Sequence, residues 1–158
     1  MEINVGYLYH IKDEFFELIN DKYLMLNHEN GHSRPNYFVL KEGKFYWAIP
    51  LSSKIKKYKE LSLKKSKYQR IHTIIIENLV NRPCAILIQN AFPVDPAYIK
   101  SIHMIDNQVL HFTKTTEEEI LKNFKKMLIL KKNGINLFYP NVDRIKLLLT
   151  ENRNLVNV

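Results

Sequence analysis

Ser52 and Ser53 place two hydroxyl groups side by side, directly before Lys54 and at the end of an apolar stretch. Hydroxyls and amides at a helix start can bind a phosphoryl oxygen, and a lysine can neutralise charge developing there. Such a group could cleave RNA without a metal, because the 2′-hydroxyl of RNA supplies the nucleophile. The structural alternative is that Ser53 only caps a helix whose lysines are solvated.

Arg34 is predicted to lie near these serines, because it opens a strand that pairs across a tight hairpin with the strand ending at Ser52. A guanidinium group suits phosphate, since its planar fork donates parallel hydrogen bonds. We therefore take four residues as the candidate catalytic set: Ser53, Ser52, Lys54 and Arg34.

Most of the net charge lies in the segment 54–70, where eight lysines or arginines accompany one acid. The resulting +7 nearly equals the formal +8 of the whole chain. Such a concentrated positive field favours a nucleic acid as partner; an acidic protein, a membrane surface or a solvated helix face are the alternatives. The segment contributes the following candidate RNA-binding residues: Lys56, Lys57, Lys59, Lys64, Lys65, Lys67 and Arg70.

Aromatic and amide side chains could add base recognition to this charge. Trp47 and Tyr58 could stack on unpaired bases, or they could pack in the core. Gln89 and Asn90 end a buried strand, where their amides either cap a turn or read a base edge. The candidate RNA-binding set is completed by two residues nearer the N-terminus, Tyr9 and His32.

The composition favours one domain with a substantial core, since 46% of the 158 residues are hydrophobic. Cys84 is the only cysteine, which excludes an intrachain disulfide and fits a reducing cytosol. The N-terminus does not resemble a signal peptide, and no stretch approaches the ~20 apolar residues of a membrane span. We expect a soluble cytoplasmic protein that does not bind membranes.

The histidines are scattered, and no metal or cofactor is predicted. His28 and His32 lie four residues apart, but in a polar loop without Cys or Asp partners at ligand spacing. His72 and His103 sit in apolar runs, which favours structural roles in the core or at a strand edge. The chain has four glycines and no Gly-rich phosphate loop.

The element pattern predicts an α+β fold with a mainly antiparallel sheet, in a single domain over residues 1–158. Two strands, 36–41 and 44–51, should form a hairpin at Gly43 that leads to Ser52. Further strands are predicted over 3–9, 73–76, 84–89 and 136–139, with a hairpin inside 102–112. Helices are predicted after Asp13, through the basic segment, from Thr116 to Lys132 with Thr115 and Glu118 as capping box, and after Pro140. The tail 152–158 is expected to be frayed.

Three segments resemble the toxin of type III toxin–antitoxin systems. They are His32-Ser33-Arg34-Pro35-Asn36-Tyr37, then Gly43-Lys44-Phe45-Tyr46-Trp47-Ala48-Ile49-Pro50-Leu51-Ser52-Ser53-Lys54, then Leu87-Ile88-Gln89-Asn90-Ala91-Phe92-Pro93. Each motif is short, but their order and spacing together are fairly specific. The similarity runs from Tyr7 through Pro140, and it is greatest to the CptN/TenpN-like branch of the ToxN/AbiQ endoribonuclease family.

The resemblance implies a compact, strongly twisted antiparallel sheet flanked by helices, like the MazF/Kid toxin fold. It also implies a metal-independent endoribonuclease that cuts its own repetitive antitoxin RNA. The cut repeats, folded as pseudoknots, would then bind and inhibit the toxin in a heterotetramer or a triangular heterohexamer. Such systems resist phage by abortive infection and stabilise plasmids.

Two departures from the ToxN branch affect the site. That branch reads Pro-Leu-Thr-Ser-Pro-Lys, whereas here Ser52 replaces the threonine and Lys54 follows Ser53 directly, so the catalytic lysine could be Lys54 or Lys56. Asn36 stands where the branch has a lysine, and Arg34 could supply that charge instead. A non-catalytic RNA- or DNA-binding module that docks through the basic segment is the alternative function.

Overall fold

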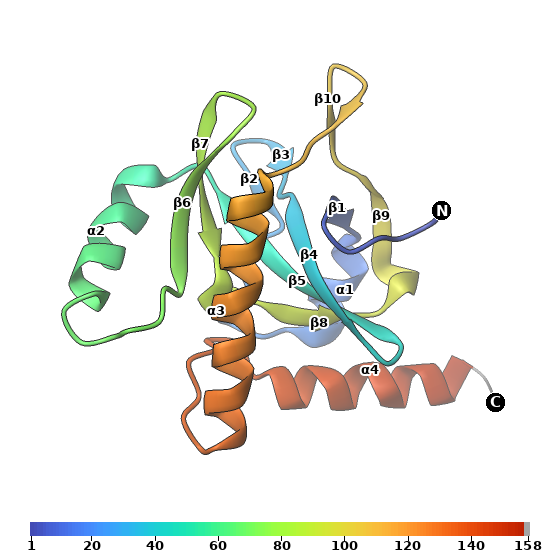
Figure 1. The fold of residues 1–158 in the computed structure, drawn as a ribbon. Helices are drawn as coiled ribbons and strands as arrows, with labels where there is room; N and C mark the ends of the chain where they lie inside the picture. The colour runs from blue at the N-terminus through green and yellow to red at the C-terminus, as the bar shows by residue number, and fades with distance from the viewer. Residues whose placement is uncertain (157–158) are drawn as a thin grey trace.

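The computed structural model describes residues 1–156 and contains a seven-stranded sheet with the order β6-β7-β5-β4-β1-β9, to which β8 adds by pairing with β5 (Figure 1). Its strand pairs are all antiparallel. The strands are β1 (Leu8–Ile11), β4 (Asn36–Glu42), β5 (Phe45–Ser52), β6 (Ile74–Leu79), β7 (Arg82–Leu87), β8 (Phe92–Val94) and β9 (Ile99–Ile102). Two short hairpins lie outside the sheet: β2 (His28–Glu29) with β3 (His32–Ser33), and β10 (Met104–Ile105) with β11 (Gln108–Val109).

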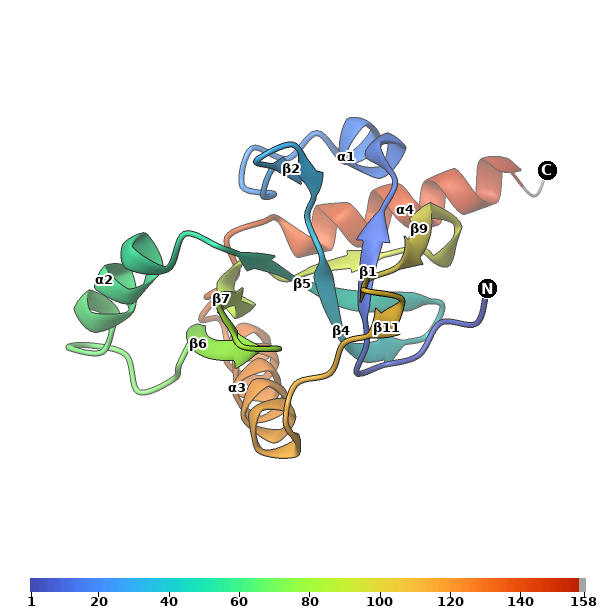
Figure 2. The ribbon, with the colours of Figure 1, turned by 90° about the horizontal axis from the view of Figure 1, so that it is seen from above.

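The helices described in this structure cover both faces of the sheet. They are α1 (Asp13–Ile19), α2 (Ile55–Lys65), α3 (Lys114–Lys132) and α4 (Val142–Val156), with 3₁₀ turns η1 (Ile88–Asn90) and η2 (Pro96–Tyr98). In Figure 2, α3 lies on one side of the sheet and α1 and α4 on the other, while α2 stands beside β6 and β7. This arrangement confirms the predicted α+β class with a mainly antiparallel sheet.

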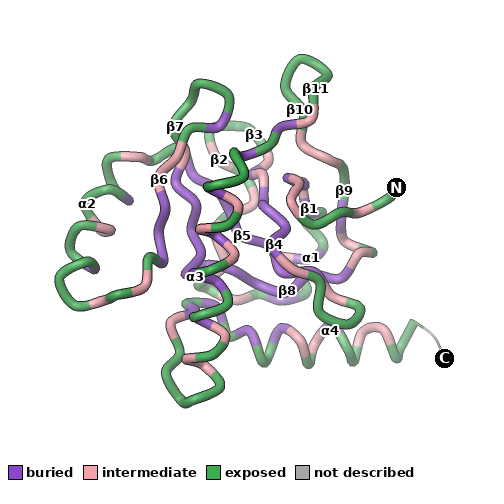
Figure 3. The backbone as a smooth tube through the Cα atoms, viewed as in Figure 1, coloured by how far each residue is buried: buried purple, intermediate pink, exposed green. Residues whose placement is uncertain are grey.

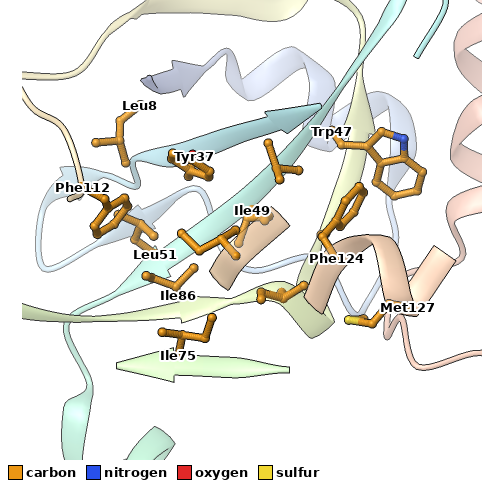
Figure 4. Packing of buried hydrophobic residues seen from close by; sticks show 14 of the residues in the cluster. Leu8, Tyr37, Trp47, Ile49, Leu51, Ile75, Ile86, Phe112, Phe124 and Met127 are labelled. Atoms are coloured by element: carbon orange, nitrogen blue, oxygen red, sulfur yellow. The ribbon is translucent and has the colours of Figure 1, made fainter. Parts of the chain in front are cut away.

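The central strand β5 is buried because it pairs with β4, β7 and β8 and is covered on both faces. Successive side chains point to opposite faces of a strand. Trp47 and Ile49 therefore pack with Phe124 of α3 (Figure 4), whereas Ala48 packs with Phe15 of α1 on the other face. Full burial of an aliphatic or aromatic side chain contributes about 1.5–3 kcal/mol. Figure 3 shows this burial concentrated in the sheet, with much of α2 exposed.

The hairpin of β4 and β5 forms as predicted and fixes the place of the serines. Gly43 adopts φ +58° in its turn, a left-handed conformation that glycine adopts without strain. The register pairs Asn36 with Pro50, so Arg34 and Ser52, each two residues further along, come to the same end of the sheet. The hairpin predicted inside 102–112 is also present, as β10 and β11, with its turn at Asp106 and Asn107.

The basic segment differs from its prediction at both ends. Helix α2 stops at Lys65, so residues 66–70 are not helical. Its N-cap residue is Lys54, which makes no side-chain cap bond. The Ser53 hydroxyl donates to Glu29 instead, so the alternative in which Ser53 only caps the helix is wrong.

The start of α3 was also predicted at the wrong threonine. The helix begins at Lys114, because the hydroxyl of Thr113 accepts a hydrogen bond from Thr116 N at 3.2 Å. The capping box of Thr115 and Glu118 is not formed. The apolar stripe of Ile120, Phe124, Met127 and Leu128 faces the core: the first three are fully buried and Leu128 is partly buried.

Several strand and tail boundaries are corrected as well. The first strand begins at Leu8, and the strand predicted over 84–89 ends at Leu87 before η1. Residues 136–139 are irregular instead of forming a strand. The predicted frayed tail is helical to Val156, because Asn152 donates to the Tyr98 hydroxyl at 2.8 Å and Arg153 pairs with Asp95; residues 157–158 lie outside the described part. No helix within residues 1–156 is long and apolar enough to cross a membrane.

Candidate active site

Three of the four predicted catalytic residues, Ser52, Ser53 and Arg34, meet at the end of β5, where each contacts Glu29 of β2. Lys54 is linked to them only through its backbone N–H, which donates to the Ser52 hydroxyl. One carboxylate oxygen of Glu29 accepts hydrogen bonds from the Ser53 hydroxyl and from Ser53 N, the latter at 3.2 Å. The other accepts from the Ser52 hydroxyl at 3.3 Å and pairs with Arg34 Nη1 at 2.6 Å. The sequence analysis missed Glu29, which links both serines to the arginine.

Arg34 is buried, with 6% of its surface exposed, and most of its donors are occupied. Nε donates to the carbonyl of Leu26 at 2.8 Å, and Nη1 donates to the carbonyl of Leu51 at 2.7 Å as well as to Glu29. Among residues 1–156 the Nη2 group has no hydrogen-bond partner, and Arg34 lines an open hollow. This group is therefore available to an anion.

Glu29 is held in its charged form by these neighbours. Burial of its carboxyl opposes ionisation, but the hydrogen bond from Ser53 and the charge of Arg34 outweigh it, so the pKa of Glu29 lies below its ordinary value. The close pairing with Arg34 leaves the two side chains without net charge. An approaching phosphate therefore meets a polarised hydroxyl and a guanidinium group, and little repulsion.

A second hydrogen-bond network, formed by Ser33, His10 and His103, lies at the same end of the sheet as the contacts of Glu29. His10 lies on β1, where its Nδ1 is 2.7 Å from the Ser33 hydroxyl and its Nε2 is 2.8 Å from His103 Nδ1. His103 follows β9 and donates its backbone N–H to the Leu8 carbonyl at 2.7 Å. Ser33, Arg34, Ser53 and His103 line one hollow of about 300 Å³, near the lower limit of small-ligand pockets.

The first lysines of the basic segment come close to this hollow, because Ser53 lines both the hollow and a depression beside them. This second, more open depression is lined by Ser53, Lys54 and the first turn of α2. His32 is exposed and lines the hollow itself. The exposed cations that we call the basic face are Lys54, Lys56, Lys57, Lys59, Lys64, Lys67 and Arg70.

Three aromatic residues predicted to bind RNA belong to the core instead. Tyr9, Trp47 and Tyr58 are 0%, 1% and 4% exposed, so no base can reach their faces. Their polar atoms are also occupied: Trp47 Nε1 donates to Glu42 at 2.9 Å, and the Tyr58 hydroxyl contacts Met25 Sδ at 3.8 Å. The RNA-binding prediction for these three residues is corrected.

Lys65, Gln89 and Asn90 are also buried and serve the fold. Lys65 donates to Thr73 Oγ1 at 3.1 Å and to Gln89 Oε1, which ties α2 to η1. Burial lowers the pKa of Lys65. Asn90 donates to a backbone carbonyl at 3.3 Å. The prediction that these three residues bind RNA is therefore corrected, whereas the other lysines of the basic segment and Arg70 are exposed.

Ser52 is also buried, and its hydroxyl is fully engaged within the protein. It is 3% exposed, and its hydroxyl accepts from Lys54 N at 3.2 Å while it donates to Glu29. Ser53 and Lys54 are exposed. Ser53 is thus the hydroxyl of the pair that a substrate can contact.

The fold is shared with a solved nuclease structure. AbiQ, a lactococcal anti-phage endoribonuclease belonging to the type III toxin–antitoxin system, superposes with a TM-score of 0.70 at 19% sequence identity, covering 98% of this chain and 100% of AbiQ. This chain has the AbiQ fold. No protein-family model and no curated protein matches it.

In the described part of the chain, no three His, Cys, Asp or Glu side chains gather as a metal-binding group.

Proposed function

We propose that this chain is an endoribonuclease toxin of a type III toxin–antitoxin system, from the CptN/TenpN-like branch. The observation that carries the proposal is the hollow in which Glu29 holds Ser53 beside Arg34, next to the basic face. The AbiQ fold supports it. RNA would lie along the basic face and bring one phosphodiester into the hollow.

The proposed reaction is metal-independent transesterification by the 2′-hydroxyl of the substrate. The Ser53 hydroxyl turns from Glu29 to a non-bridging oxygen of the scissile phosphate, while Arg34 Nη2 and Lys54 or Lys56 stabilise the added negative charge of the phosphorane. The bond from phosphorus to O5′ breaks. The products are a 2′,3′-cyclic phosphate and a 5′-hydroxyl.

The proposed partner is a repetitive antitoxin RNA. The toxin would cut it into pseudoknot repeats, and these would occupy the hollow and the basic face of the toxin in a heterotetramer or triangular heterohexamer. Cellular or phage RNA would be the substrate of the free toxin, so its site of action would be the cytoplasm, and the result would be phage resistance.

Incubation of the purified chain with RNA in excess EDTA tests the proposal. We expect cleavage, with cyclic phosphate and 5′-hydroxyl ends identified by phosphatase and kinase treatment. An absolute Mg²⁺ requirement, or 3′-hydroxyl and 5′-phosphate ends, contradicts the mechanism. The basic face alone favours a second candidate, a non-catalytic RNA- or DNA-binding module, which would retain RNA without cutting it.

A further inference from the structure

The row of hydrogen bonds from Ser33 through His10 to His103 ends at an open ring nitrogen. Among residues 1–156, His103 Nε2 has no hydrogen-bond partner, and His103 lines the hollow that holds Ser53 and Arg34. The two networks are also adjacent in sequence, since Ser33 precedes Arg34. In the proposed reaction the residues around Glu29 orient the phosphate and stabilise its charge, and the 2′-hydroxyl proton must pass to a further group.

We propose that His103 is the proton-transfer residue of this site, and that His10 and Ser33 are its positioning residues. This assignment rests on the proposed function. It uses a histidine whose apolar sequence context predicted a structural role.

The row can present His103 in two states, because each hydrogen bond needs one donor and one acceptor. When His10 Nδ1 donates to the Ser33 hydroxyl, His10 Nε2 accepts from His103 Nδ1, and His103 Nε2 is left with a free lone pair. When the Ser33 hydroxyl donates to His10, the order reverses and His103 Nε2 carries a hydrogen. The first state is a base directed at the substrate.

The surroundings keep this base neutral at neutral pH. Burial lowers the pKa of His103. Burial, followed by the charges of His103 and of Lys100 on β9, lowers the pKa of His10 to about 4. A neutral imidazole can accept a proton, whereas an imidazolium cannot.

In the assigned step the 2′-oxygen forms its bond to phosphorus as its proton passes to His103 Nε2, and the bond from phosphorus to O5′ breaks. O5′ takes a proton from water. The hydroxide that remains recovers the proton from His103, so the site returns to its starting state.

His103→Ala tests this assignment in single-turnover cleavage of a labelled RNA that the unmodified chain cuts. We expect the rate to fall about 10²–10⁴-fold with unchanged RNA affinity, and added imidazole to restore part of it. His103→Gln, which can keep a hydrogen bond to His10, should lose rate equally. His10→Asn should shift the acid limb of the pH–rate profile, because it replaces the imidazole that is hydrogen-bonded to His103 by an amide. The matched control is His72→Gln, because His72 is exposed and lies outside the hollow. This variant should cleave the RNA at the rate of the unmodified chain.

The outcomes separate this assignment from the proposed function. Equal rates for the unmodified chain and His103→Ala overturn the role of His103 while nuclease activity stands. A loss that imidazole does not reverse, with a lowered melting temperature, makes His103 structural and also overturns it. If the unmodified chain cuts no RNA, the proposed function fails and the assignment fails with it.

Discussion

At the scale of single residues, the key contact of the site is one that the sequence could not reveal. Glu29 lies in a short polar hairpin, 24 positions before Ser53, and nothing local distinguishes it from a solvated acid. Ser53 could be selected from sequence because it ends an apolar strand before a lysine. Whether it capped a helix or faced a ligand depended on Glu29, and therefore on tertiary structure.

Ser53→Ala should reduce cleavage about 10²–10³-fold, the usual loss when a preorganised donor is removed. Because its side chain does not cap α2, the variant should lose only about 0.5–1.5 kcal/mol, that of a hydrogen bond. Growth inhibition without antitoxin RNA, together with urea unfolding, measures the two effects.

Ser66→Ala is the matched control, since Ser66 is exposed and its hydroxyl donates to a nearby carbonyl at the end of α2. It should remain toxic. A folded Ser53→Ala protein that cuts RNA at the parent rate would place the chemistry elsewhere.

At the scale of elements, α2 combines two kinds of lysine that look alike in the sequence. Lys65 lies seven residues after the buried Tyr58 and so falls on the inward face of the helix. This spacing indicates a buried Lys65, but the many lysines around it made the whole segment resemble a solvated basic surface. The other lysines of the segment are exposed.

Reversing the charge of Lys59, Lys64 and Lys67 to Glu should weaken RNA binding by orders of magnitude without unfolding the protein. The logarithm of the binding constant falls linearly with the logarithm of the salt concentration. The steepness of this fall should decrease by roughly 0.7–0.9 for every phosphate that the variant no longer neutralises. Binding isotherms over a series of salt concentrations measure both.

The same triple reversal on α3, at the exposed Lys122, Lys125 and Lys126, controls for net charge. It should weaken binding far less. Equal losses from both triples would mean that overall charge, and not the basic face, holds the RNA.

Lys65→Met should lower the free energy of unfolding by about 1–3 kcal/mol, because Gln89 and Thr73 lose their buried donor. Urea denaturation measures this change. The neighbouring exposed residue provides the comparison: Lys64→Met should stay within about 0.5 kcal/mol of the unmodified chain. Equal stabilities of the two variants would show that the buried ammonium contributes nothing.

At the scale of the whole molecule, the parts that the sequence predicted are those with local signals. Gly43 between two β-rich runs defines the central hairpin, and the apolar stripe of α3 defines the helix over the sheet. The histidine row could not be foreseen, because His10 and His103 are 93 positions apart and meet only through the pairing of β1 with β9. Sheet topology therefore assembles the site from segments that carry little signal alone.

The histidine row should make the whole fold sensitive to mild acid. As pH falls below the ordinary histidine pKa of 6.5, the unfolded chain gains protons at His10 and His103, whereas native His10 stays neutral until its pKa of about 4. The unfolded state then binds more protons, so the free energy of unfolding falls through this window. As pH falls past 4.5, the ordinary pKa of a glutamate, Glu29 and Glu42 extend the loss, because their pKa values are lowered in the folded chain and the unfolded chain is protonated first.

Urea unfolding at a series of pH values between 7 and 4 measures this dependence, and His10→Asn assigns it. The variant should show a shallower fall of stability across the window, because one group with a lowered pKa is gone. His72→Asn, at an exposed ring, should follow the unmodified chain. If the curves of the unmodified chain and His10→Asn run parallel from pH 7 to 4, native His10 titrates normally, and the neutral row that positions His103 does not exist in solution.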